Sequence, residues 1–300
     1  MTSALVIPLP GNEDLAGRIA LGLNAESGKI ETRNFPDGET YVRVAGEVTG
    51  REVVLVCTLD RPDAKFLPLT FAATTARQLG ATRVGLVAPY LAYMRQDKRF
   101  REGEAVTSTI FATLLSSAFD WLVTVDPHLH RYQSLDEIYS IPAEAVHSAP
   151  LLADWIAANV PAPLVIGPDI ESEQWVSEVA ARAKSPYRVL RKERRGDRNV
   201  EIAIPDLREF SDRTPVLVDD IVSSGRTVVE TARHLKRQGM LPPICMAVHA
   251  LLSPDAYDAL REAAATVVST NTVKHESNRI DIAALLVEGV SPFLGDRRDG

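Results

Sequence analysis

The stretch Pro215–Leu235, PVLVDDIVSSGRTVVETARHL, holds the densest group of residues that could do chemistry in this sequence. Its apolar start predicts a buried strand over Val216–Asp219, which ends in the adjacent carboxylates of Asp219 and Asp220. Successive strand residues face opposite sides, so these carboxylates can share a pocket only where the strand stops. An amphipathic pattern then predicts a helix over Val228–Gln238.

The loop between this strand and this helix consists of small and hydroxylated residues: Ser223, Ser224, Gly225, Arg226 and Thr227. Glycine lets a backbone approach a ligand, and the N–H groups at a helix N-terminus attract phosphate. Two carboxylates beside such a loop suit sugar hydroxyls or Mg²⁺. The alternative is a plain strand-turn-helix junction with a hydroxyl cap and solvated aspartates. The order of the elements favours a site for a phosphorylated sugar.

The segment Asn34–Glu39, NFPDGE, offers a different set of groups. Phe35 is an aromatic side chain that could stack on a base, and Pro-Asp-Gly is typical of a turn. The carboxylates of Asp37 and Glu39 flank Gly38 in this turn. Taken alone, the segment is better explained as a surface β-turn with a phenylalanine packed beneath it.

A basic cluster stands out from the otherwise acidic chain. Arg191–Arg198 contains five basic and two acidic residues, a local charge of +3. Transfer of a diphosphoryl group spreads negative charge over many oxygens, which a cation-rich loop could stabilise. The alternative is a solvated, charged connection between two strands.

The composition of the whole chain excludes several classes of protein. The 300 residues carry a net charge of −7 with 45% hydrophobic residues, which is typical of a globular protein and unlike a general nucleic-acid binder. We find no apolar run long enough for a membrane span and no signal peptide. Cys57 and Cys245 lie in apolar runs and are interpreted as buried thiols of a reducing compartment. These features predict a cytoplasmic protein.

Strand and helix patterns alternate along the chain, which predicts an α/β fold with mostly parallel sheets flanked by helices. The predicted strands are Val53–Cys57, Val84–Ala88, Leu122–Val125, Leu164–Gly167, Val216–Asp219, Ile244–Val248 and Thr266–Thr270. The predicted helices are Glu13–Leu23, Lys65–Leu79, Ser108–Phe119, Ala149–Ala158, Glu173–Ala183, Val228–Gln238 and Asp255–Ala263. We expect two similar domains, residues 1–145 and 146–300, with the proline-containing segment Asn159–Pro163 as the best candidate boundary.

Motifs in a fixed order connect these features to one family. Asp219–Thr227 resembles the phosphoribosyl pyrophosphate (PRPP) motif of phosphoribosyltransferases and PRPP synthetases, with Ser224 where threonine is usual. Asn34–Glu39 resembles the Phe-x-Asp-Gly-Glu signature of ribose-phosphate pyrophosphokinases, and Pro89–Ser108 resembles their Pro-Tyr-aromatic-x-Tyr-x-Arg-Gln-Asp segment. Thr124–His128, TVDPH, is similar to their Val-Asp-x-His strand end.

Three further segments follow the same order. Gly167-Pro168-Asp169 resembles the family's Ser/Ala-Pro-Asp turn, and Leu190–Val200 occupies the place of its flexible Lys-x-Arg loop. Ser269–Val273 resembles its Thr-rich strand end. The sequence therefore resembles the ribose-phosphate pyrophosphokinase (PRPP synthetase) family, and after His128 it is similar to the shorter archaeal-type enzymes.

This resemblance implies two tandem phosphoribosyltransferase-like domains and a set of site residues. It implies ATP binding by Phe35, Asp37, Gly38, Glu39, Arg95, Gln96 and Asp97; ribose 5-phosphate binding by Asp219, Asp220, Ser223, Ser224, Gly225, Arg226 and Thr227; Mg²⁺ binding by His128 and Asp169; and catalysis by Lys192 and Arg194. An arginine such as Arg95 suits phosphate because its fixed donors match the phosphate oxygens. On the same basis, His130 is taken to be incidental.

The implied activity is transfer of the β,γ-diphosphoryl group of ATP to the 1-hydroxyl of ribose 5-phosphate, giving PRPP and AMP. The implied partners are these two substrates and further copies of the chain, with neither nucleic acid nor membrane. Two alternatives stay open: a non-catalytic regulatory paralogue, and a transferase that consumes PRPP. A transferase would have no use for the segments around Phe35 and Arg95, and a regulatory paralogue would have lost catalytic residues such as Lys192.

Overall fold

The computed structural model describes residues 4–195, 199–203 and 206–294, and the side chains of Glu171 and residues 191–205 lie outside this description. The chain divides into two compact units, one made of residues 1–147 and 283–300 and the other of residues 148–282. Each unit contains one six-stranded sheet. Within the described residues, no helix is both long and apolar enough to cross a membrane.

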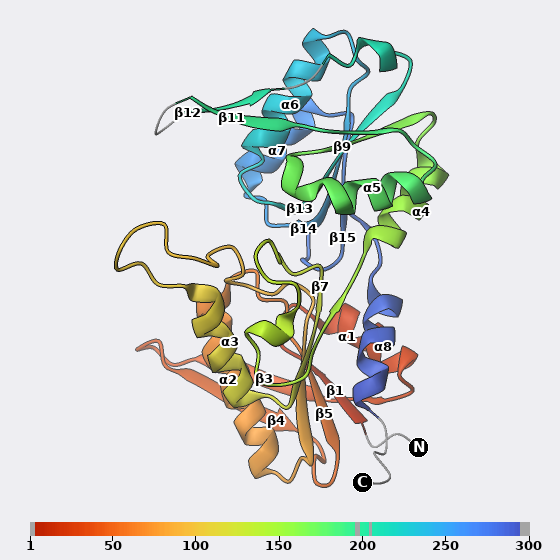
Figure 1. Ribbon diagram of the computed structural model, residues 1–300. Helices are drawn as coiled ribbons and strands as arrows, with labels where there is room; N and C mark the ends of the chain where they lie inside the picture. Colours follow the sequence, from red (N-terminus) through yellow and green to blue (C-terminus); the bar gives the residue numbers. More distant parts are fainter. Residues whose placement is uncertain (1–3, 196–198, 204–205, 295–300) are drawn as a thin grey trace. The chain divides into compact units, whose positions relative to one another are not determined.

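The first unit is built on a parallel sheet with strand order β2-β1-β5-β6-β7-β8. Its strands are β1 (Ala4–Pro8), β2 (Glu26–Ser27), β5 (Glu52–Val56), β6 (Arg83–Ala88), β7 (Trp121–Val125) and β8 (Ala143–Val146). Helices α1 (Glu13–Gly22) and α8 (Ala283–Val290) pack on one face, and α2 (Pro62–Gln78) and α3 (Thr107–Ala118) on the other (Figure 1). The central strands are mostly apolar because helices cover both of their faces.

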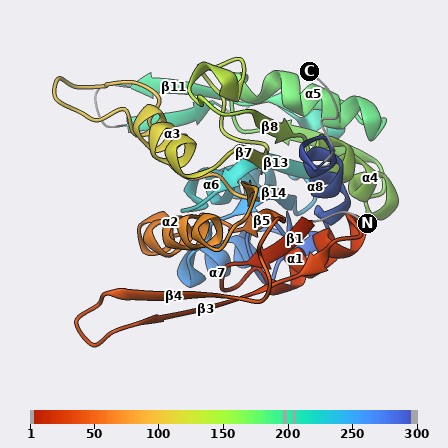
Figure 2. The ribbon, with the colours of Figure 1, turned by 90° about the horizontal axis from the view of Figure 1, so that it is seen from below.

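The first unit also carries an antiparallel hairpin of its own. Strand β3 (Lys29–Asn34) pairs with β4 (Thr40–Ala45), and the pair forms a two-stranded sheet separate from the six-stranded one. The register places Arg33 opposite Tyr41 and Glu31 opposite Arg43. Figure 2 shows this hairpin as a long ribbon extending from the unit.

The second unit repeats the plan with strand order β10-β9-β13-β14-β15-β16, again parallel throughout. Its strands are β9 (Pro163–Gly167), β10 (Tyr187–Val189), β13 (Thr214–Val222), β14 (Ile244–Ala250), β15 (Thr266–Thr270) and β16 (Asn278–Ile280). Helices α4 (Ala149–Asn159) and α5 (Glu173–Arg182) pack together, as do α6 (Arg226–Arg237) and α7 (Pro254–Ala263). Strands β11 (Arg191–Arg195) and β12 (Asn199–Ala203) form a separate antiparallel ribbon.

These elements confirm the predicted fold class. All seven predicted strands and all seven predicted helices are present, with ends shifted by a few residues. The division of the chain differs from the expected one at two places. Asn159–Pro163 lies inside the second unit, where it connects α4 to β9. Helix α8, expected in the second domain, belongs to the first unit because it packs against α1, β7 and β8.

The two cysteines are buried and free, as predicted. Cys57 lies in the first unit and Cys245 in the second. Burial raises the pKa of each thiol to about 12, so both stay protonated at neutral pH. They are packing residues and carry no nucleophile for the site.

Candidate active site

The loop after β13 is the best-defined candidate site in the second unit, and its acidic pair lies differently from the prediction. Strand β13 runs to Val222, three residues past the expected end, and Asp219 pairs in register with Ala247 of β14. Both carboxylates are half-buried, and Asp220 accepts a hydrogen bond from the N–H of Ile221 at 2.7 Å. Because the strand continues, Asp219 and Asp220 face opposite sides of it.

Gly225 makes the turn from this strand into helix α6. It lies at the N-cap position with a φ of 63°, and its carbonyl accepts the first helical hydrogen bond from Val229 at 2.8 Å. The helix begins at the exposed Arg226 and continues for 12 residues, so its N-terminal N–H groups face the loop of Ser223 and Ser224. This is the strand-loop-helix arrangement that binds phosphate at a helix N-terminus.

A cavity of about 10 Å³ next to this loop is lined by two segments that are distant in the sequence. Its lining includes Asp219 and Thr227 from the loop region and Gly167 and Pro168 from the end of β9. Strands β9 and β13 are neighbours in the parallel sheet, so both of their carboxyl ends lie at one edge. The cavity is large enough for one water at most.

Thr231 is a residue of this cavity that sequence reasoning missed. It lies on α6 four residues after Thr227, is 1% exposed and lines the cavity with Asp219. Among the described residues, its hydroxyl is one of four buried side-chain polar groups with no hydrogen-bond partner. The helical spacing of four residues between two threonines was the available signal.

Asp169 follows β9 at the same edge of the sheet. It caps the short turn Ile170–Ser172, accepting a hydrogen bond from the N–H of Ser172 at 3.2 Å, while the Ser172 hydroxyl donates to the Asp169 carbonyl at 2.6 Å. Capping holds the carboxylate in a fixed orientation beside the cavity-lining Gly167 and Pro168. A carboxylate oxygen is the donor that Mg²⁺ prefers, so Asp169 fits the metal role that the resemblance implies.

In the first unit, the Asn34–Glu39 segment forms the turn of the β3–β4 hairpin. The N–H of Phe35 donates to the carbonyl of Glu39 at 2.7 Å, Gly38 has a φ of 93°, and Asp37 accepts from the N–H of Glu39 at 3.2 Å. Phe35 is 39% exposed. The predicted turn is therefore present, and the ring is accessible on its surface.

A cation-aromatic cluster surrounds this ring. The guanidinium of Arg33 lies 4.5 Å from the ring centroids of both Phe35 and Tyr41, and these two rings pack edge to face at 6.4 Å. Such contacts fix the orientation of Phe35 on a hairpin that belongs to no larger sheet. The cluster leaves Phe35 able to stack on a flat ligand.

Residues of the loop that follows His130 hold the segment Arg95–Asp97 in place. Arg131 pairs with the carboxylate of Asp97 at 3.2 Å, and the Tyr132 hydroxyl donates to the Asp97 carbonyl at 3.4 Å. Asp97 is thus engaged in structure, with a side chain only 8% exposed. Arg95 is exposed and Gln96 half-buried.

His128 lies after β7 in a strained segment. Asp126 is buried with a φ of 34°, and its carboxylate lies 3.1 Å from Nδ1 of His147. The ring of His128 contacts that of His130, with Nδ1 of His128 and Nε2 of His130 3.1 Å apart. The structure therefore gives His130 a partner role that the sequence interpretation did not. An imidazole supplies a nitrogen donor for a metal, and its orientation here is set by the second histidine.

Lys192 and Arg194 lie on strand β11, where their backbones pair with Ile202 and Val200 of β12. The expected loop is therefore an antiparallel ribbon over these residues. The side chains of both residues lie outside the described part of the chain, and their predicted catalytic role stays a prediction.

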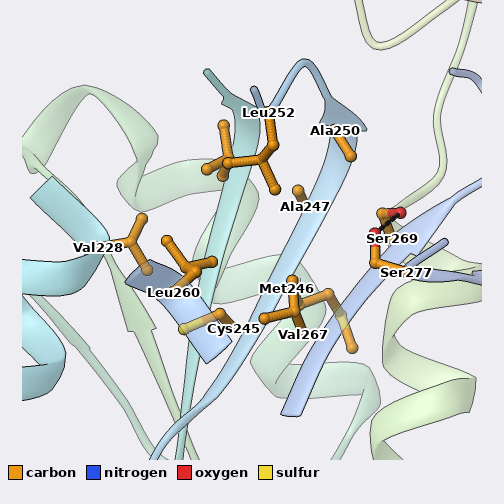
Figure 3. A pocket seen from close by; sticks show the side chains of 11 residues that line it. Val228, Cys245, Met246, Ala247, Ala250, Leu252, Leu260, Val267, Ser269 and Ser277 are labelled. Atoms are coloured by element: carbon orange, nitrogen blue, oxygen red, sulfur yellow. Dashed lines mark hydrogen bonds between the residues drawn. The ribbon is translucent and has the colours of Figure 1, made fainter. Parts of the chain in front are cut away.

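A second cavity in the second unit is also about 10 Å³ in volume, and its lining does not include Asp219 or Asp220. Figure 3 shows its wall, which is apolar except for Ser269 and Ser277, whose hydroxyls are hydrogen-bonded to each other at 2.7 Å. With both hydroxyls satisfied and no ionisable group apart from the buried Cys245, this cavity is a packing gap in the core.

The fold and the loop define a protein of the phosphoribosyltransferase type, and family models agree. Residues 134–283 match the phosphoribosyl transferase domain. Residues 4–118 match the N-terminal domain of ribose phosphate pyrophosphokinase.

Whole-chain relatives give the family. The ribose-phosphate pyrophosphokinase of Methanopyrus kandleri is 35% identical, with 94% of this chain and 96% of the relative covered. That of Methanobrevibacter smithii is 32% identical, with 93% and 97% covered. The chain belongs to the ribose-phosphate pyrophosphokinase family.

A solved structure has the same fold. The crystal structure of phosphoribosylpyrophosphate synthetase from Mycobacterium smegmatis superposes with a TM-score of 0.84 at 23% identity, covering 97% of this chain and 98% of the other. The similarity extends over both units.

Proposed function

We propose that the protein is a ribose-phosphate diphosphokinase that converts ATP and ribose 5-phosphate to PRPP and AMP. The observation that carries the proposal is the loop Ser223–Thr227, which joins an acidic strand to the N-terminus of α6 beside the Gly167–Pro168 turn. Family membership supports it over the whole chain. In the reaction, a bond forms between the 1-hydroxyl oxygen and the β-phosphorus, and the bond from that phosphorus to the AMP oxygen breaks.

The second unit would bind the sugar phosphate. The N–H groups of the loop and of the first turn of α6 would donate to the 5-phosphate, and the hydroxyls of Ser223, Ser224 and Thr227 would add further hydrogen bonds. Asp219, which lines the cavity with Thr227, would accept from ribose hydroxyls, whereas Asp220 faces the other side of β13. These contacts would orient the 1-hydroxyl for attack, which is how an enzyme lowers the entropic part of the barrier.

The nucleotide would be held by residues of the first unit. Phe35, fixed by Arg33 and Tyr41, would stack on adenine, with Asp37, Gly38 and Glu39 in the same turn. The guanidinium of Arg95 would bind phosphate oxygens, and Gln96 and Asp97 would complete the nucleotide site. Lys192 and Arg194 would stabilise the charge that develops on the transferred group.

Mg²⁺ is the cofactor that the resemblance to the family implies, and each of its two predicted ligands offers a suitable donor atom. Asp169 in the second unit would offer it a carboxylate oxygen, and His128 in the first unit would offer it an imidazole nitrogen. Bound there, Mg²⁺ would neutralise phosphate charge as a Lewis acid. The aspartate is held by its cap to Ser172 and the histidine by its contact with His130.

The test is an assay of the purified chain with ATP, Mg²⁺ and ribose 5-phosphate. We expect AMP and PRPP in equal amounts, measured by chromatography. Binding of ribose 5-phosphate without AMP formation would favour the regulatory alternative. Release of pyrophosphate from PRPP in the presence of a free base would favour the PRPP-consuming transferase.

A variant tests the assignment of the basic ribbon. Lys192→Ala should lower turnover by about 100-fold or more and leave ATP binding largely intact, because an electrostatic donor to the transferred group acts mainly in the transition state. Lys236→Ala, which removes an exposed lysine from α6, is the matched control and should keep normal turnover. Normal turnover in Lys192→Ala would remove this residue from the mechanism.

A further inference from the structure

The hydroxyl of Thr231 is buried inside the second unit without a partner. The side chain is 1% exposed, and its Oγ1 makes no hydrogen bond within the described part of the chain. A threonine inside a helix can donate to the carbonyl three or four residues earlier, as Thr113 of α3 does to Thr109 at 3.0 Å. Thr231 makes no such bond. A buried hydroxyl without a partner is costly, so this position needs a partner that the described residues do not supply.

This hydroxyl lies beside a cavity, which distinguishes it from the comparable groups. Within the described residues, three other buried side-chain groups have no partner: the hydroxyls of Thr124 and Tyr139 and the indole N–H of Trp175. None of the three lines either of the two cavities described above. In the apolar cavity of Figure 3, the hydroxyls of Ser269 and Ser277 are bonded to each other. Among these groups, Thr231 is the one that combines an unsatisfied hydroxyl with space next to it.

The cavity beside Thr231 has the size and the lining of a site for one water. Its volume is about 10 Å³, and Asp219 and Thr227 supply the other polar side chains of its wall. An ordered buried water makes about two to four hydrogen bonds. The Thr231 hydroxyl can donate to such a water, which can donate in turn to the carboxylate of Asp219 and the hydroxyl of Thr227. Three side chains supply too few oxygens for a divalent cation, which takes about six.

We propose that Thr231 is a positioning residue, which holds the carboxylate of Asp219 through one ordered water in this cavity. A water fixed by a buried hydroxyl gives the carboxylate one preferred orientation, because the carboxylate accepts and the water donates. Asp219 would accept from the ribose hydroxyls, so the inference rests on the proposed function. The same water would reach Thr227, which would bind the 5-phosphate, and would thereby connect the two parts of the sugar site.

The first test removes the hydroxyl and keeps the shape of the side chain. Thr231→Val should raise the dissociation constant of ribose 5-phosphate by about 10-fold, measured by calorimetric titration, and leave that of ATP unchanged, because only the sugar site loses a hydrogen bond. Thr231→Ser keeps the hydroxyl and should bind ribose 5-phosphate as the unmodified chain does. The matched control is Thr266→Val, which changes an exposed threonine at the start of β15 and should also bind normally.

The outcomes of this titration separate the inference from the proposed function. Failure of the unmodified chain to bind ribose 5-phosphate would overturn the proposed function and, with it, the role of Thr231. Equal dissociation constants in the unmodified chain and in Thr231→Val would overturn the role of Thr231 alone. Equal weakening in Thr231→Ser and Thr231→Val would also overturn that role, since the hydroxyl would then not be the group that matters.

A second test examines the water itself and needs no substrate. A high-resolution crystal structure of the unmodified chain should show a density peak within hydrogen-bond distance of Oγ1 of Thr231 and of the carboxylate of Asp219. Thr231→Val should lower the urea midpoint if the hydroxyl binds a water and raise it if the hydroxyl is dry, because an unsatisfied buried polar group destabilises the fold. A cavity without a density peak, or a raised midpoint in Thr231→Val, would overturn the proposal.

Discussion

His275 is a histidine whose surroundings oppose its charge. Its Nδ1 accepts a hydrogen bond from the N–H of Ser277 at 3.1 Å and lies 2.7 Å from the Ser277 hydroxyl, and its ring packs edge to face on Tyr257. Burial lowers the pKa of His275, and the nearby Glu276 only partly offsets this. A protonated Nδ1 can no longer accept from Ser277, so the folded chain favours the neutral ring.

We therefore expect stability to fall on acidification. The folded pKa of His275 lies below the ordinary value of 6.5, so the unfolded chain binds the proton more tightly. The contribution of the neutral ring is complete above pH 6.5 and is lost as the pH falls through the lowered folded pKa. Urea midpoints measured at several pH values from 5 to 8 should show this loss in the unmodified chain.

The matched variant for this residue is His275→Asn, which keeps an acceptor but does not titrate. Its urea midpoint should depend less on pH than that of the unmodified chain, since the other five histidines are unchanged. The same pH dependence in both proteins would assign the effect to another group.

At the scale of elements, the junction between β13 and α6 depends on one glycine. Gly225 has a φ of 63°, and a Cβ added there would lie 2.6 Å from Cδ1 of Leu260. Gly239, after the same helix, has a φ of 81° but no atom within 4 Å of an added Cβ. The two positions thus share the backbone requirement for glycine and differ in the space around it.

We predict that Gly225→Ala costs about 2–4 kcal/mol of stability, from backbone strain plus overpacking, and Gly239→Ala about 1–2 kcal/mol from strain alone. Gly225→Ala should also weaken binding of ribose 5-phosphate, because the loop would shift. Urea unfolding and calorimetric titration measure the two effects. Equal losses of stability in the two variants would contradict the importance of the close contact with Leu260.

The sequence predicted those elements whose own residues carry a clear hydrophobic pattern. Apolar runs such as Val84–Ala88 are buried on both faces and are strands by composition alone. Strand β3 has only one partner and mostly exposed side chains, so no apolar pattern indicated it beyond its turn at Asn34–Glu39. The continuation of β13 past Asp219 depends on pairing with β14, which a local pattern does not contain.

The residues of the candidate site also divide into those that a local sequence pattern predicted and those that only the folded structure shows. A glycine and hydroxyls between a strand and a helix are a local signal, and the loop at Gly225 was predicted from it. The contact of His130 with His128 and the position of Thr231 beside Asp219 result from the folded backbone. For these residues the spacing along the chain was a weak guide.

At the scale of the whole molecule, the chain returns to its first unit after completing the second. Val287 of α8 packs so closely on α1 that a Cβ on Gly22 would lie 2.6 Å from Cγ2 of Val287. Phe293 stacks on Trp121 with ring centroids 5.0 Å apart, and its carbonyl accepts a hydrogen bond from Arg83 at 2.8 Å. The first unit is therefore completed by residues that lie last in the sequence.

Removal of these residues should destabilise the first unit selectively. A chain that ends at Ile282 loses the buried Leu286 and Val290 and uncovers Trp121, at a cost of about 5 kcal/mol to the first unit by apolar area alone. Hydrogen exchange followed by mass spectrometry should show faster exchange in β7 and α1 and unchanged protection in β13 and β14. A chain that ends at Leu294 keeps α8 and should retain the protection of both units. Equal loss of protection in the two units of the shorter chain would mean that α8 supports the molecule as a whole and not its first unit.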